Sequence, residues 1–251
     1  FWKADRRLYE IELSFPFLML VSAINLDSAW REFRKSNYQN MPAFYYPILP
    51  IDPEERKHAL YGVSIDKVHD PTLAFLLRDK RKELGIQLDM LQERGTEDFL
   101  YSSLRLYKTI DEELLDLAKL LLKEIPVRKV KAGTVTARQL AQRVEEEFDY
   151  YRQQDADFQS KTHLGSRIPG LMVSRGELYI PTGLKLRESR VEALLQHEVG
   201  THVLTYYNGS RQPMQLLRLG LADYDELQEG IAVLTEYLIG GLDPLRLRLL
   251  A

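Results

Sequence analysis

The sequence predicts a mostly helical α+β fold, with one small sheet placed just before the helix that carries the most informative motif. Three observations lead to this prediction. Helix-start signals recur through the first half of the chain, a single β-hairpin pattern covers residues 171–180, and a capped apolar helix follows from Ser189. With 251 residues, we expect one domain, 1–251, divided into a mainly helical part, 1–133, and a core around the motif, 134–251.

Composition narrows the class of protein. The chain is 45% hydrophobic and 28% charged, as expected of a globular protein, and its net charge of −3 predicts no nucleic-acid partner. The longest apolar run, 15–21, is far shorter than the roughly 20 residues of a membrane span, so none is predicted. The chain contains no cysteine, which excludes disulfides and thiolate metal ligands. We expect a cytoplasmic protein.

The first half of the chain reads as a series of helices. Residues 1–40 predict two helical pieces, and the three prolines within 42–50 predict an extended segment. Asp52-Pro53 and Asp70-Pro71 each place an N-cap aspartate before a proline at the first helical position. Two further helices are predicted to open near Thr96 and Thr109.

A short basic linker, 127–133, separates these helices from one predicted to run from about Thr136 to Asp155. His163 falls in a predicted loop. The hairpin at 171–180 then ends before Pro181, which restricts the second strand to a sheet edge or a strand end. An edge strand here could hold an extended peptide by main-chain hydrogen bonds, and a purely structural hairpin fits equally well.

The central motif is H-E-V-G-T-H at residues 197–202, on a helix predicted to start with the capping box Ser189-x-x-Glu192. His197 and His202 are five residues apart, which on a regular helix separates them by about 140°. One π-helical turn would bring both side chains to the same face, and such turns are frequent at functional sites. The alternative is two unrelated histidines, one buried and one exposed.

A second helix, predicted to start near Asp223 and to stop at Gly240-Gly241, carries Glu229 in an early turn. If this helix lies antiparallel to the first, Glu229 meets the two histidines. The alternative is a surface carboxylate, because Glu226 and Glu236 share its face. The opposite side of the helix is apolar, with Leu227, Ile231, Leu234 and Leu238.

Two imidazoles and a carboxylate are the usual protein ligands of a catalytic zinc ion, which keeps a fourth position for water. H-E-V-G-T-H followed by Q-E-G-I-A at 228–232 resembles the QEGLA-motif family. Its bacterial members are labelled flavohemoglobin expression-modulating proteins, and its eukaryotic relatives are microtubule-associated tyrosine carboxypeptidases, which remove the C-terminal tyrosine of α-tubulin. The resemblance is densest over residues 168–250, and Ile231 replaces the leucine of the family's motif.

The resemblance implies a zincin-like metallopeptidase core, with His197, His202 and Glu229 as ligands of Zn²⁺ and Glu198 as general base. The predicted function is zinc-dependent peptide hydrolysis, as a metallocarboxypeptidase that removes a residue, an aromatic one among the options, from a peptide or protein C-terminus. The microtubule role does not carry over, because nothing in the sequence marks a tubulin-binding surface. The alternative is a non-catalytic metal-binding regulator of gene expression, which would need the three ligands but not Glu198.

A carboxypeptidase also needs a cation for the terminal carboxylate and a donor for the developing oxyanion. Arg211 is the preferred cation, with Lys185 and Arg175 behind it. The unranked candidates for the oxyanion are Tyr206, Tyr207, Tyr224 and His163.

Overall fold

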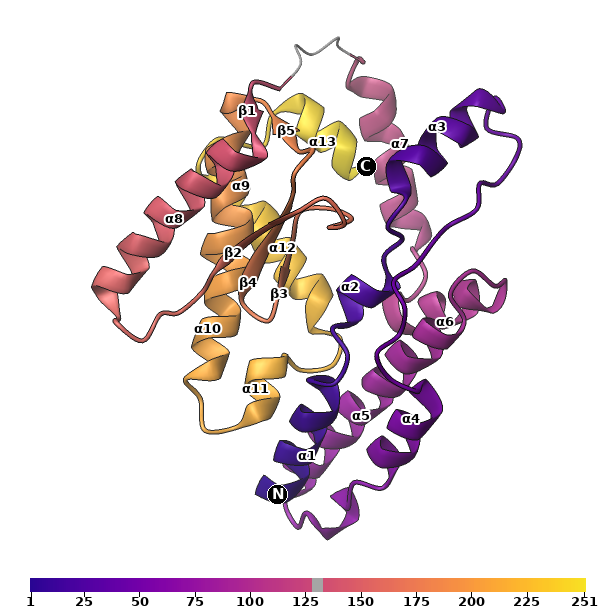
Figure 1. Cartoon of the computed structure of the whole chain (residues 1–251), viewed down its shortest axis with the longest axis vertical. Helices are drawn as coiled ribbons and strands as arrows, with labels where there is room; N and C mark the ends of the chain where they lie inside the picture. Colours follow the sequence, from indigo (N-terminus) through magenta and orange to yellow (C-terminus); the bar gives the residue numbers. More distant parts are fainter. Residues whose placement is uncertain (128–132) are drawn as a thin grey trace. The chain divides into compact units, whose positions relative to one another are not determined.

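A computed structural model describes residues 1–127 and 133–251, and the chain folds into two compact units (Figure 1). The first unit comprises residues 1–107, 167–170 and 206–224, and the second comprises the described parts of 108–166 together with 171–205 and 225–251. The expected single domain with a division at residue 133 stays a prediction. The basic linker predicted at 127–133 falls largely outside the described residues.

The first unit is helical around a leucine-rich core. Its helices are α1 (Trp2–Glu12), α2 (Phe17–Val21), α3 (Leu26–Lys35), α4 (Pro53–Tyr61), η1 (Ile65–Lys67), α5 (Pro71–Gln92), α6 (Asp98–Tyr107) and α11 (Gln215–Leu219), joined by most of α10 (Leu204–Ser210). The side chains of Asp52 and Asp70 accept the predicted hydrogen bonds from the first turns of α4 and α5. The first 40 residues form three helices rather than the predicted two, because a new helix begins after Pro16.

One stretch, Trp2–Lys35, qualifies as a candidate membrane span by length and composition alone. Within it the structure forms three helices of 11, 5 and 10 residues. Each is shorter than the roughly 20 helical residues that cross a bilayer.

The second unit holds the motif and mixes helices with short strands. Its elements are α7 (Glu112–Glu124), β1 (Val135–Thr136), α8 (Ala137–Gln154), β2 (Thr162–Gly165), β3 (Met172–Ser174), β4 (Glu177–Pro181), β5 (Lys185–Leu186), η2 (Glu188–Arg190), α9 (Val191–His197), η3 (Glu198–Val203), α12 (Tyr224–Leu238) and α13 (Pro244–Leu250). A mostly helical α+β fold is therefore confirmed. α8 begins with the capping box formed by Thr136 and Gln139.

The sheet of this unit has the strand order β2-β4-β3. β3 and β4 form the predicted antiparallel hairpin, and β4 ends at Pro181. Of the two positions that Pro181 allowed, a sheet edge or a strand end, the structure has the strand end, because β4 is the central strand. The prediction that His163 lies in a loop was wrong, since His163 lies in β2, which pairs parallel with β4. The strand β2 has no alternating apolar pattern of its own, so only pairing with β4 defines it.

One face of β4 packs against the helix that carries the motif. Leu178 and Ile180 are buried, while the alternating Glu177 and Tyr179 are partly exposed. Both β3 and β4 lie in contact with η3. The motif helix therefore lies on the apolar face of the sheet, next to the edge strand β3.

The start of the motif helix differs from the prediction. Ser189 lies inside the 3₁₀ turn η2, α9 begins at Val191, and no side chain caps it. The carboxylate of Glu192 instead accepts a hydrogen bond from Gln196, one turn later at 3.1 Å. The proposed capping box is therefore absent, because its glutamate pairs forward along the helix rather than back to the N-terminus.

Candidate metal centre

The segment between the two histidines is a π-helix. η3 (Glu198–Val203) interrupts the α-helical pattern immediately after His197, as the five-residue spacing predicted. The hydroxyl of Thr201 donates a hydrogen bond to the carbonyl oxygen of Gln196 at 3.0 Å, five residues earlier. This bond satisfies a backbone acceptor within the widened turn, so Thr201 helps to hold the irregular conformation.

The widened turn brings both imidazoles to one side, where α12 supplies a carboxylate. The Nε2 atom of His202 lies 3.3 Å from Oε1 of Glu229, and the Nε2 atom of His197 lies 3.6 Å from its Oε2. The donor atoms of the three residues all fall within 4.8 Å of one another. Ligands about 2 Å from a tetrahedral ion are separated by about 3.3 Å, so these side chains fit a single ion with small adjustments.

A close approach between α9 and the end of α12 sets the spacing of the two helices. α12 ends in a turn where Gly240 has a φ of 73° and the amide of Gly241 donates to the carbonyl of Glu236 at 2.8 Å. A Cβ atom on Gly241 would lie 2.4 Å from the Cβ of Ala193 on α9. Only glycine allows this approach, because no real pair of carbon atoms comes so close.

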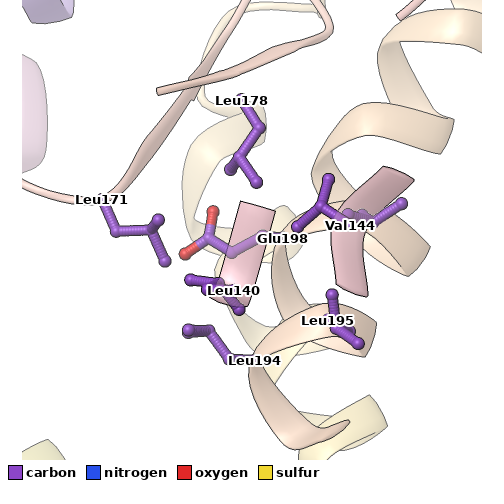
Figure 2. Close-up of a pocket in the computed structure, with 8 residues that line it drawn as sticks. Leu140, Val144, Leu171, Leu178, Leu194, Leu195 and Glu198 are labelled. Atoms are coloured by element: carbon purple, nitrogen blue, oxygen red, sulfur yellow. The ribbon is translucent and has the colours of Figure 1, made fainter. Parts of the chain in front are cut away.

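Glu198, the residue after the first histidine, faces an apolar pocket (Figure 2). The side chains around its carboxylate come from α8, α9, η3 and the hairpin: Leu140, Val144, Leu171, Leu178, Leu194, Leu195 and Val199. Within the described residues the carboxylate accepts no hydrogen bond. Burial in this setting raises the pKa of Glu198 to about 7, and the nearby Glu229 and Glu236 also raise it, whereas His197 lowers it.

The sequence of residues 31–251 matches the family model of the microtubule-associated tyrosine carboxypeptidases. The chain belongs to this family. Searches of curated proteins and of solved structures find no match. The family's description denotes a carboxypeptidase, which is a hydrolase, so membership supports an enzyme with a peptide or protein substrate.

In this member of the carboxypeptidase family, a second carboxylate on the same face of α12 as Glu229 is fully buried. The side chain of Glu236 is 0% exposed, and its oxygens accept hydrogen bonds from Arg246 at 2.8 and 3.0 Å. Arg190 lies 2.8 Å from Oε2. Glu236 follows Glu229 by seven residues, or two helical turns, so the shared face could have indicated that both lie beside the histidines.

The consequence is that α12 buries the carboxylate of Glu236 and exposes its apolar stripe. Leu227, Ile231, Leu234 and Leu238, which the sequence places opposite Glu229, are each at least 40% exposed. The ordinary amphipathic rule therefore fails for this helix. The carboxylates of Glu229 and Glu236 lie beside His197 instead.

The charges around the site shift the pKa values of its residues in opposite directions. Burial lowers the pKa of His197, but Glu229, Glu198 and Glu236 together raise it above the usual value. Burial is also the main reason why the pKa of His202 is lowered, although Glu229 and a hydrogen bond with Gln228 oppose it. Contact with His197 lowers the pKa of Glu229. A divalent cation binds neutral imidazoles and an ionised carboxylate, so at His197 it competes with the proton that the raised pKa favours.

Burial raises the pKa of Glu236, but hydrogen bonds from Arg246 and Arg190 outweigh burial and hold it below its usual range. The residue is therefore an ionised carboxylate in the interior. Such a group persists only when its partners satisfy it, as the two guanidinium groups do here.

The remaining candidates named from the sequence are scattered. His163 places Nε2 2.7 Å from Glu177 and stacks on Tyr179 with ring centroids 4.6 Å apart, on the sheet face opposite to Leu178 and Glu198. The geometry does not support His163 as the oxyanion donor. Lys185 lies in β5, and Arg175 lies at the hairpin turn with a φ of 54°.

The other candidates belong to the first unit: Arg211, Tyr206, Tyr207 and Tyr224. Within that unit the hydroxyl of Tyr206 accepts a hydrogen bond from Arg218 at 2.8 Å. Arg211 as the carboxylate-binding residue stays a prediction, and so do the tyrosines as oxyanion donors.

Proposed function

We propose that this chain is a zinc-dependent carboxypeptidase that removes the last residue of a peptide or protein. The observation that carries the proposal is the meeting of His197, His202 and Glu229, with Glu198 in the π-helical turn beside them, in a chain of a carboxypeptidase family.

The donor set favours zinc among the divalent metals. Two imidazole nitrogens and one carboxylate oxygen are typical of catalytic zinc sites with three protein ligands, whereas calcium and magnesium prefer oxygen alone. Structural zinc sites commonly use four protein ligands, often cysteines, and this chain has none. When bound, zinc would act as a Lewis acid on the substrate carbonyl and lower the pKa of a water molecule.

Glu198 is the proposed general base. Its carboxylate has no hydrogen-bond partner among the described residues, and its raised pKa suits the exchange of a proton near neutral pH. It would take one proton from the attacking water as the new C–O bond forms at the scissile carbonyl. It would then give that proton to the leaving amine as the C–N bond breaks, which returns the carboxylate to its starting state.

The β3 edge is the proposed support for the substrate backbone. β3 pairs with β4 on one side, and within the described residues no strand pairs with its other side. Because β3 lies against η3, an extended peptide added to this edge would run past Glu198. Main-chain hydrogen bonds of this kind would align the scissile bond without requiring a particular side chain.

Selection of the chain end requires a cation, and Arg211 is the proposed partner of the terminal carboxylate because a guanidinium group can bind it through two hydrogen bonds. A terminal tyrosine is the proposed preference, by extension from the family's description. A cytoplasmic location also remains part of the proposal. A regulator without catalysis is not favoured, because it would not require Glu198 next to the ligands.

The test is peptide trimming by the purified chain loaded with zinc. Matched peptides ending in tyrosine, phenylalanine or alanine would be incubated with it, each with a free or an amidated C-terminus, and followed by mass spectrometry. The expected result is loss of one residue from the free-acid peptides, fastest for tyrosine, and none from the amidated ones. Internal cleavage, or no cleavage by protein that contains one zinc per chain, would contradict the proposal.

A further inference from the structure

The imidazole of His197 lies between two carboxylates. Its Nε2 atom faces Glu229 at 3.6 Å, and its Nδ1 atom lies 2.9 Å from Oε1 of Glu236. The two ring nitrogens point in different directions, so one can bind a metal while the other donates a hydrogen bond. Glu236 therefore lies next to the ring nitrogen of His197 that faces away from the proposed metal position.

Glu236 is held in this position by arginines from two elements. The guanidinium of Arg246, on α13, donates from two nitrogens to its two oxygens, and Arg190, on η2, approaches Oε2. Arg190 also donates to the carbonyl of Gly241 at 2.8 Å, which ties η2 to the turn after α12. A carboxylate restrained in this way can orient a neighbouring ring.

The Nδ1 atom of His197 is buried and lacks a well-aligned hydrogen-bond acceptor among the described residues. Glu236 is nevertheless within hydrogen-bonding distance of it, so the mismatch is one of angle and not of distance. A modest rotation of the ring about its Cβ–Cγ bond would align the two groups. A buried N–H left without an acceptor would be costly, so Glu236 is its natural partner.

We infer that Glu236 is a positioning residue that accepts a hydrogen bond from Nδ1 of His197. It thereby holds this histidine in the tautomer whose Nε2 lone pair faces the metal position. α12 thus contributes twice, with Glu229 as a ligand and, two turns later, Glu236 as the group that orients another ligand. The inference rests on the proposed function for the metal and its ligands, but not on the reaction catalysed.

A purely structural role for Glu236 leads to a different expectation. If it served only to join α12 to Arg190 and Arg246, its replacement would reduce stability and leave the zinc affinity of the folded molecules unchanged. If it orients His197, the zinc affinity of the folded molecules falls. Metal affinity separates the two roles, whereas catalytic rate alone does not.

The first experiment measures the zinc dissociation constant by competition with a chromophoric chelator, for the wild type, Glu236→Gln and Glu226→Gln. Glu226 lies on the same helix but is exposed, so it is the matched control. We expect Glu236→Gln to bind zinc about 10- to 100-fold more weakly, the usual effect of removing a group that orients a metal-binding histidine. The control should stay within about twofold of the wild type. Wild-type affinity in folded Glu236→Gln would overturn the inference.

The second experiment uses the wild type, because Glu236→Gln leaves two partly buried guanidinium groups unneutralised and could fail to fold. Long-range ¹H–¹⁵N spectra of the metal-free protein at alkaline pH report which nitrogen of each neutral histidine carries the proton, and His197→Gln assigns the signals. We expect the proton of His197 on Nδ1. A proton on Nε2 would overturn the inference.

The two experiments also separate this inference from the proposed function. A wild type that binds zinc but trims no peptide would contradict the carboxypeptidase proposal and leave the role of Glu236 intact. The tautomer of the metal-free protein tests that role even if zinc is not the metal.

Discussion

Each of the two units contains a buried carboxylate, and the two carboxylates are used differently. In the first unit Asp5, which is 2% exposed, accepts hydrogen bonds from the backbone amides of Gln215 and Leu216 at 2.8 Å each. In the second unit Glu236 accepts from two arginines and approaches His197, whose other nitrogen faces His202 and Glu229.

The difference lies in where the chain of polar contacts ends. Asp5 and its partners satisfy one another, so this group of contacts joins α1 to α11 and is complete. The contacts of Glu236 lead instead to three donor atoms that converge on a common point, which is an arrangement for a ligand. Buried polar groups that close on themselves stabilise a fold, whereas those that leave converging donors indicate a binding site.

The largest expected effect comes from removing one of the three converging metal ligands, His197, His202 and Glu229. His202→Ala removes one of three ligands, so bound zinc should fall from one ion per chain to background while the chain stays folded. Elemental analysis after gel filtration measures the metal, and circular dichroism checks the fold. His69→Ala, at an exposed position of the first unit, should keep its zinc. Full zinc occupancy in His202→Ala would show that this histidine is not a ligand.

The next largest effect is expected when Glu198, the proposed proton acceptor, is replaced while the metal stays bound. Glu198→Gln keeps the shape of the side chain but cannot accept a proton, so kcat for peptide trimming should fall by about 10²–10⁴-fold. Zinc content should not change, because Glu198 is not among the converging donors. Glu192→Gln, on the exposed side of α9, is the control and should keep wild-type activity. An equally active Glu198→Gln enzyme would exclude Glu198 as the base.

Removing the contacts of Asp5 with α11 should lower stability and leave metal binding unchanged. Asp5→Ala leaves one buried and one partly buried backbone amide without an acceptor, so the free energy of unfolding should fall by about 3 kcal/mol. Zinc affinity of the folded protein should remain within about twofold of the wild type. Urea denaturation and chelator competition measure the two quantities. A large loss of zinc affinity would mean that Asp5 is coupled to the site and that the contrast between the units is wrong.

The smallest expected effect concerns the π-helical turn. Thr201→Val keeps the size of the side chain but removes the hydroxyl that bonds to the carbonyl of Gln196. The free energy of unfolding should fall by about 1 kcal/mol, the usual net contribution of one hydrogen bond. Urea denaturation measures it, and Thr205→Val, one turn further along, is the comparison. An unchanged stability would show that the hydroxyl does not support the turn.

Several features of the site followed from the sequence because they depend on local spacing. The i, i+5 spacing of His197 and His202 required a widened helix if both were to face one ion, and η3 is that helix. The aspartate-proline pairs at the starts of α4 and α5, and the hairpin of β3 and β4, were likewise recognisable because each signal lies within a few residues. Such features hold in almost any tertiary context.

Other features depended on contacts between residues far apart in the chain, and only the tertiary structure decided them. β2 exists as a strand because β4 pairs with it. Burial of the Glu198 carboxylate requires leucines from α8 and from the hairpin. Burial of Glu236 could not be predicted from its position in the sequence, because the arginines that neutralise it lie on η2 and α13. The sequence by itself determined the types of ligand and the irregular turn that presents them. Packing determined which carboxylates are buried, since the cost of burying a charge depends on partners that local sequence does not reveal.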